Sequence, residues 1–158
     1  MTVAAFVAAN ADATRELGAR FARAWIAARL NDDALLVVLT GELGAGKTTF
    51  VAGALAALGN ASPVRSPTYT LVEPYELGGR TVAHGDLYRL RHPGELDDIG
   101  LRDLLQPGAL VFIEWPERAE GRLGTPDLAL DFRYAADGGR HVSVRSQTTL
   151  GQLVLSHI

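Results

Sequence analysis

The sequence predicts an α/β fold, in which a mixed sheet has parallel central strands, antiparallel hairpin additions and flanking helices. Two short runs, residues 34–39 and 109–113, are apolar throughout, which is typical of parallel strands covered on both faces. Two other segments contain strand-like runs joined by glycine-rich turns, at Gly78-Gly79 and at residues 137–139, which indicates antiparallel hairpins. We expect one domain over residues 1–158.

Composition limits the class of protein. The chain has 158 residues, of which 47% are hydrophobic and 21% charged, as in an average soluble domain. The absence of cysteine excludes disulfides and thiolate zinc sites. A net charge of −3 argues against a protein that coats nucleic acid by charge alone. No apolar run approaches the ~20 residues needed to span a bilayer, and the N-terminus lacks the basic start of a secretory signal. We therefore expect a cytoplasmic protein without a membrane partner.

The first regular element is expected to be a helix that begins near Asp12 or Thr14, either of which could cap it. Apolar residues then recur at helical spacing and form one stripe. These are Leu17, Phe21, Ala24, Trp25 and Ala28. Residues 34–39 form the first buried strand. Residues 48–58 read as a helix that ends at Gly59.

The second half of the chain starts with a hairpin formed by residues 69–77 and 80–87. A helical segment is expected at residues 94–105, where Gly100 could divide it. The strand at residues 109–113 follows. The remaining elements are a hairpin and a short helix from Leu150. The hairpin strands are residues 127–134 and 141–145.

A glycine-rich loop joins the first apolar strand to the next helix and matches the pattern G-x-x-x-x-G-K-[ST]. Such glycines allow successive backbone N–H groups to face one point, where the helix N-terminus adds partial positive charge. We therefore expect a P-loop NTPase-like domain that binds ATP and Mg²⁺ through this loop. Lys47 would reach the β- and γ-phosphates and Thr48 would ligate Mg²⁺. Thr49 could contact the α-phosphate or pack in the first turn. The loop consists of Gly41, Glu42, Leu43, Gly44, Ala45, Gly46, Lys47 and Thr48.

Two carboxylates are candidates for the acid that a phosphate loop needs near its metal. Glu114 ends the second apolar strand and could bind Mg²⁺, directly or through water, or orient the attacking water. Asp86 follows a hairpin strand, so both remain candidates for the water-positioning base. Trp115 is either a packing residue or a contact of the nucleotide. The loop at residues 66–70, which includes Thr68, is either a nucleotide-sensing switch or a plain connection.

Five ordered blocks of the chain resemble the bacterial TsaE (YjeE) family. The first is the phosphate loop with Thr49 and Phe50, and the second is Ser66-Pro67-Thr68-Tyr69-Thr70-Leu71-Val72-Glu73. The third is His84-x-Asp86-Leu87-Tyr88-Arg89-Leu90. The last two are Ile99-Gly100-Leu101-Arg102-Asp103 and Ile113-Glu114-Trp115. The phosphate loop alone would not identify the family, whereas the five blocks in this order are specific and span nearly the whole chain.

The resemblance implies the ATPase component of the bacterial machinery that makes N6-threonylcarbamoyladenosine (t6A) at position 37 of tRNA. It implies work with TsaD and TsaB, a reset of that complex by ATP hydrolysis, and indirect contact with tRNA. The catalytic residues carried over are Lys47, Asp86 and Glu114, with Thr48 and Glu114 at the metal. Thr68 falls in the switch-like loop and Trp115 lies beside the site. One departure is Gly85, where the family usually has a bulky apolar residue, and its backbone freedom could loosen Asp86.

Other P-loop functions remain as alternatives. A small-molecule kinase would need an arginine-bearing lid, for which Arg118 and Arg122 are the nearest candidates. A regulatory GTPase would need an Asn-Lys-x-Asp motif, which the sequence lacks. A nucleotide-gated interaction module with weak hydrolysis of its own is a third class, and the resemblance falls largely in it.

Overall fold

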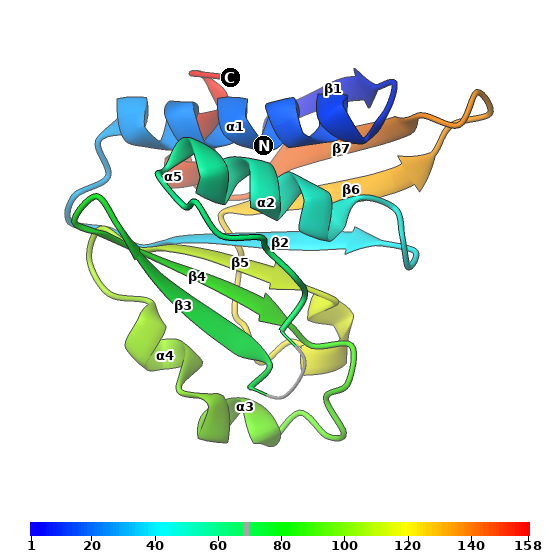
Figure 1. The fold of residues 1–158 in the computed structure, drawn as a ribbon. Helices are drawn as coiled ribbons and strands as arrows, with labels where there is room; N and C mark the ends of the chain where they lie inside the picture. Colours follow the sequence, from blue (N-terminus) through cyan, green and yellow to red (C-terminus); the bar gives the residue numbers. More distant parts are fainter. Residues whose placement is uncertain (68–69) are drawn as a thin grey trace.

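The computed structural model describes residues 1–67 and 70–158 and has one seven-stranded sheet with helices on both faces (Figure 1). The strands are β1 (Val3–Ala8), β2 (Leu35–Gly41), β3 (Val72–Leu77), β4 (Arg80–Asp86), β5 (Leu110–Glu114), β6 (Leu128–Tyr134) and β7 (Arg140–Ser146). The helices are α1 (Ala11–Ala28), α2 (Lys47–Ala57), α3 (Glu95–Ile99), α4 (Leu101–Leu104) and α5 (Thr149–Leu155), with a 3₁₀ turn at Pro116–Ala119.

The order of strands across the sheet is β1-β7-β6-β2-β5-β4-β3. β2 lies between β5 and β6 and runs parallel to both, and β4 runs parallel to β5. The remaining neighbours, β3 beside β4, β7 beside β6 and β1 beside β7, are antiparallel. The structure therefore confirms a mixed sheet with parallel central strands and hairpin additions. Because β2 is central and fully covered, its run of apolar residues needs no polar alternation.

Each face of the sheet carries its own apolar core. On one face α1, α2 and α5 pack over the sheet, and the rings of Phe21, Phe50 and Phe112 meet with centroids 5.7–6.3 Å apart. On the other face α3 and α4 cover the strands β3, β4 and β5 (Figure 1), where Leu96 and Leu101 are buried. The two layers hold β2 rigidly, which positions the loop at its end.

Helices α1 and α2 approach each other closely because each contributes a glycine at the contact. A Cβ atom on Gly18 would lie 2.0 Å from the carbonyl oxygen of Phe50, and one on Gly53 would lie 2.0 Å from that of Arg15. No side chain fits into either space. These glycines therefore set the spacing between the two helices.

Two expectations for the N-terminal region are wrong. Asn10, rather than Asp12 or Thr14, caps α1, because its side chain accepts a hydrogen bond from the N–H of Ala13 at 2.8 Å. Residues 3–8 form the edge strand β1, whereas no strand was expected before the first helix. Its partner is β7, so the stabilising hydrogen bonds come from residues near the other end of the chain.

The turn and helix-breaking signals are confirmed. Gly78 and Gly79 have φ of 58° and 76° in the β3–β4 turn, and Gly138 has φ of 85° in the β6–β7 turn. Gly100, with φ of 72°, divides the expected helix into α3 and α4. The expected strand 69–77 begins only at Val72, because Thr70 and Leu71 form a bend in which Leu71 has φ of 59°, while Tyr69 lies outside the described residues. Among the described residues no helix is both long and apolar enough to cross a membrane.

Candidate active site

The glycine-rich loop connects the C-terminal end of β2 to the N-terminus of α2, as its sequence predicts. Gly41, Gly44 and Gly46 have φ of 140°, 78° and 108°, a region in which side chains are unfavourable. Gly46 caps α2 without a side chain, and the N–H groups of residues 47–49 have no acceptor among the described residues. The loop and the helix N-terminus thus present free donors and partial positive charge, which fits the phosphates of a nucleotide.

Lys47 lies inside this loop and is almost fully buried. Its ammonium group donates to the carbonyl oxygen of Gly41 and, at 3.0 Å, to that of Glu42. It also lies 4.5 Å from the ring centroid of Trp115, a cation–π distance. Burial lowers the pKa of Lys47, while the negative charges of Glu114, Asp86 and Glu117 oppose that shift. The single lysine of the chain is therefore held at the point where phosphate oxygens would enter.

Glu114 is the centre of a buried polar network at the end of β5. Both of its carboxylate oxygens accept from the hydroxyl group of Thr48, at 3.1 and 2.9 Å. Its Oε2 atom lies 2.6 Å from Nε2 of His84, and the Thr48 and Ser66 hydroxyl oxygens are 2.8 Å apart. Glu114 is only 2% exposed and is therefore not a solvent-facing acid at a strand end. The structure therefore joins the two predicted metal ligands directly.

Asp86 lies beside Glu114 because β4 and β5 run parallel, with these two residues in register. Its Oδ1 atom accepts from the N–H of Tyr88 at 2.9 Å, and its own N–H donates to the carbonyl of Leu71. Burial raises the pKa of Asp86, and the charge of Glu114 raises it further. The N–H of Tyr88, His84 and the hydroxyl of Ser66 act in the opposite direction. Asp86 is thus a half-buried carboxyl group that faces a second one.

Gly85 does not loosen Asp86 as its backbone freedom suggested. It is buried in β4 with partners on both sides, since β4 pairs with β3 and β5. A Cβ atom there would lie 2.7 Å from Cδ1 of Ile113. Gly85 therefore accommodates the Ile113 side chain, and the sheet holds Asp86 in place.

Most of the predicted site residues line one cavity of about 120 Å³. Of those from the loop and helix, Gly41, Glu42 and Ala45 are not part of its lining, although the carbonyls of Gly41 and Glu42 hold Lys47. Thr68 lies outside the described residues. The lining consists of Leu43, Gly44, Gly46, Lys47, Thr48, Thr49, Ser66, Asp86, Glu114 and Trp115. Sequence reasoning thus assembled one site from four separate segments.

A second cavity of about 220 Å³ adjoins the other side of the loop. Thr14 and Asn10 of the α1 start contribute to it, together with Arg140 from β7. Gly44, Gly46 and Thr49 line both cavities, so the two spaces meet along the loop. Together they offer room for a ligand longer than a phosphate chain.

Three residues that support the site had no role assigned from the sequence. His84 was quoted only as part of a motif, yet it contacts Glu114. Arg140 donates to the loop carbonyls of Ala45 at 3.0 Å and Gly44 at 3.3 Å, and Tyr134 donates to that of Leu43 at 2.8 Å. The sequence pattern of the loop does not indicate these partners, because they come from β4, β6 and β7.

The chemistry of the donor set fits Mg²⁺ bound together with phosphates. Among residues 1–67 and 70–158, no three His, Asp or Glu side chains form a cluster that could hold a metal alone. One hydroxyl group, of Thr48, and one carboxylate, of Glu114, face each other at the loop. Mg²⁺ keeps several waters and takes the rest of its oxygen ligands from substrate phosphates in such sites.

The sheet, the glycine loop and the buried acid at the neighbouring strand end define a P-loop-type α/β protein. A comparison with solved structures supports this class: the crystal structure of Bacillus subtilis YdiB superposes with a TM-score of 0.77, covering 98% of this chain and 93% of that one at 22% identity. The likeness to YdiB shows the fold alone.

Residues 8–142 match the family model described as threonylcarbamoyl adenosine biosynthesis protein TsaE. The tRNA threonylcarbamoyladenosine biosynthesis protein TsaE of Haemophilus influenzae is 42% identical over 79% of this chain and 78% of its own length. The protein of the same name from Treponema pallidum is 37% identical over 75% and 87%. The chain belongs to the TsaE family, which confirms the resemblance.

Proposed function

We propose that this protein is the magnesium-dependent ATPase component of the machinery that makes N6-threonylcarbamoyladenosine in tRNA. It acts in the cytoplasm with TsaB and TsaD and meets tRNA only through that complex. The observation that carries the ATPase part is the contact of Thr48 with both oxygens of Glu114 at the end of the phosphate loop. Membership of the TsaE family supports the pathway.

The loop binds the phosphate chain through its free N–H groups and the N-terminus of α2. Lys47 exchanges the carbonyls of Gly41 and Glu42 for oxygens of the β- and γ-phosphates. Bound Mg²⁺ would neutralise charge that develops on the transferred phosphoryl group. Thr48 and Glu114 are the residues that would hold it.

The two carboxylates take different parts in this proposal. Both oxygens of Glu114 accept hydrogen bonds from Thr48, the other proposed metal ligand, and one oxygen also contacts His84. These contacts support a role for Glu114 as a ligand of Mg²⁺. Asp86 has one oxygen on the N–H of Tyr88, and its side chain lines the cavity at the loop. Asp86 therefore orients the attacking water toward the γ-phosphate. Trp115, over Lys47, covers the entrance.

The enzymatic test is ATP hydrolysis by the isolated protein and by its mixture with purified TsaB and TsaD. We expect slow hydrolysis alone and strong stimulation by the two proteins together. Lys47→Ala is expected to abolish hydrolysis, because it removes the charge that stabilises the phosphates. Arg145→Ala serves as the control, since Arg145 is exposed on β7. Unchanged hydrolysis in Lys47→Ala rejects the site.

A binding test does not depend on turnover. Lys47 is the only lysine, so the chain has two amines that can be labelled, the Lys47 side chain and the N-terminus. We expect ATP with Mg²⁺ to protect Lys47, and not the N-terminus, from an amine-reactive label, as read by peptide mass spectrometry. Equal labelling with and without nucleotide, at a reaction time long enough to label the buried Lys47 of the nucleotide-free protein, contradicts ATP binding at the loop.

The alternative of a small-molecule kinase receives no support from the arginines expected in its lid. The guanidinium of Arg118 lies over the ring of Tyr88 at 5.4 Å, and Arg122 lies 4.0 Å from Asp97. Neither lines the cavity at the loop. A screen of phosphate acceptors that gave rapid, product-forming turnover would reverse this preference.

A further inference from the structure

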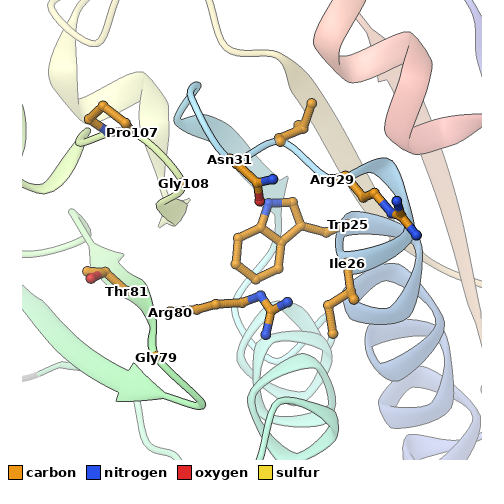
Figure 2. A pocket seen from close by; sticks show the side chains of 10 residues that line it. Trp25, Ile26, Arg29, Asn31, Gly79, Arg80, Thr81, Pro107 and Gly108 are labelled. Carbon is orange, nitrogen blue, oxygen red and sulfur yellow. The ribbon is translucent and has the colours of Figure 1, made fainter.

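A cavity of about 600 Å³ lies at the opposite end of the sheet from the phosphate loop, and Figure 2 shows the side chains that line it. Its walls come from the end of α1, the turn before β2, the start of β4 and the loop before β5. β2 begins shortly after this cavity and ends at the loop, so the two sites are roughly 20 Å apart along the strand. The cavity is therefore separate from the site described above.

Trp25 forms the centre of this cavity wall (Figure 2). Its side chain is almost fully buried, and its indole Nε1 has no hydrogen-bond partner among the described residues. A buried N–H without an acceptor destabilises a folded protein, because it has lost its hydrogen bonds to water. The nitrogen edge of the ring faces the side of the cavity where Asn31 lies. The described residues thus supply no acceptor for the indole N–H of Trp25, and we consider a ligand in the cavity as its acceptor.

The charged side chains that line the cavity have one sign. The lining residues include Arg29 and Arg80 and no acidic residue, although the whole chain carries a net charge of −3. In the described part of the chain no carboxylate lies within ion-pair distance of either arginine. Two acidic residues contact the wall from outside: Glu76 accepts a hydrogen bond from the Thr81 hydroxyl at 2.9 Å, and the backbone carbonyl of Asp33 accepts one from the N–H of Gly108. The two arginines therefore give this cavity a preference for anionic ligands.

The two arginines are placed differently. Figure 2 shows the Arg80 side chain reaching from the start of β4 toward the indole ring, whereas Arg29 turns to the outer side of α1. The carbonyl groups at the end of α1 bring partial negative charge. Arg80 is consequently the cation that a ligand beside Trp25 would meet.

We propose that this cavity is a second binding site, which takes a carboxylate or phosphate oxyanion on a ligand with an apolar part. The guanidinium of Arg80 matches such a group with two parallel hydrogen bonds. The N–H of Trp25 and the amide of Asn31 supply further donors. Ile26, 38% exposed, and Pro107 offer the apolar surface. The cavity volume lies within the range of about 300–1,000 Å³ that small-molecule sites have.

The indole N–H groups allow a direct test, because the chain has only two tryptophans. In the full-length protein labelled with ¹⁵N-tryptophan, Trp115→Phe assigns the two indole signals. Glutarate and inorganic phosphate are titrated separately. We expect a saturable shift of the Trp25 signal, with glutarate leaving the Trp115 signal in place. A response to glutarate alone identifies a carboxylate ligand, and a response to phosphate alone identifies a phosphorylated one.

Arg80→Gln is expected to weaken this binding at least tenfold. Arg80 is exposed at the first residue of β4, so the variant should fold, and the dispersion of the ¹H–¹⁵N spectrum checks this. Arg89→Gln, an exposed arginine outside the cavity, should bind as the parent protein does. The proposal is overturned if neither probe shifts the Trp25 signal, or if Arg80→Gln responds like the parent. It stands independently of ATP hydrolysis.

Discussion

The Nε2 atom of His84 lies 2.6 Å from the Oε2 atom of Glu114, and both side chains are buried. This contact joins the neighbouring parallel strands β4 and β5 at their C-terminal ends, on the edge of the sheet where β2 leads into the phosphate loop. It fixes one carboxylate oxygen of Glu114 while both oxygens face Thr48. His84 is therefore a positioning residue for the proposed metal ligand.

Replacing His84 is expected to impair metal use before nucleotide binding. His84→Leu leaves the buried carboxylate without this partner, and loss of such a supporting contact typically costs about 10–100-fold in metal affinity or activity. His84→Gln, whose amide nitrogen can occupy the place of Nε2, should recover part of the loss. The measurement is the Mg²⁺ concentration that gives half-maximal ATP hydrolysis, with affinity for nucleotide in the absence of metal measured alongside. An unchanged Mg²⁺ requirement in His84→Leu would refute the positioning role.

The back of the phosphate loop is held by the hairpin of β6 and β7. Arg140 and Tyr134 bind the carbonyls of Ala45, Gly44 and Leu43, which keeps those oxygens turned away from the N–H groups of the loop. The Arg140 guanidinium also lies 4.3 Å from the ring centroid of Tyr134.

We expect Arg140→Gln to weaken ADP binding at least tenfold, since a hydrogen bond to a charged group contributes about 1.5–3 kcal/mol and about 1.4 kcal/mol is a factor of ten. Tyr134→Phe, which loses one neutral hydrogen bond, should have a smaller effect. Isothermal titration calorimetry with ADP provides the measurement. Arg145→Gln on the same strand is the control, and equal affinities in all variants would show that the loop keeps its shape unaided.

Asp86 should destabilise the folded protein at neutral pH. Its pKa in the folded state is raised above the ordinary value of 3.8, mainly by burial, so the folded state binds its proton more tightly than the unfolded state does. The free energy of unfolding therefore falls as the pH rises from 3.8 through the folded-state pKa. Asp86→Asn removes this carboxylate and keeps an oxygen for the N–H of Tyr88.

We consequently expect Asp86→Asn to raise the melting temperature at pH 7 and to abolish most ATP hydrolysis. The stabilisation should shrink as the pH falls toward 3.8, where the parent residue is protonated. Thermal unfolding across this pH range measures the effect. Asp33→Asn, at an exposed turn before β2, should leave the melting temperature unchanged. A lower melting temperature for Asp86→Asn at pH 7 would contradict the claim that the ionised carboxylate of Asp86 destabilises the folded protein.

Gly53→Ala should destabilise the protein even though alanine favours helices. Its methyl group would meet the carbonyl oxygen of Arg15 at 2.0 Å, so α1 and α2 must separate. Overpacking of this kind costs about 1–3 kcal/mol of unfolding free energy. Ala56→Gly, on the exposed face of the same helix, should cost up to about 1 kcal/mol through helix propensity alone. Chemical denaturation compares the two, and a stabilised Gly53→Ala would disprove the close contact.

Much of the fold follows from signals that are local in the sequence. Paired glycines predict both hairpins because only their backbone freely adopts positive φ, and the structure confirms such φ at Gly78, Gly79 and Gly138. The strand β1 could not be predicted in this way. Its run of apolar residues is short, and it forms a strand only by pairing with β7. Likewise, the choice of Asn10 over Asp12 as the cap depended on where the chain leaves that edge strand.

The phosphate loop and the acid at the end of a buried strand can be predicted from local sequence. Their residue types and spacing are dictated by the backbone angles and charges that a nucleotide requires. The groups that support them depend on how the strands are arranged in space. His84 is 30 residues from Glu114, and Arg140 is 95 residues from Ala45. His84 and Glu114 meet because the parallel strands β4 and β5 bring their carboxyl ends to one edge of the sheet. Arg140 reaches the same edge because β7 runs antiparallel to β6 and begins there. Both contacts follow from strand order and direction, which no local pattern contains.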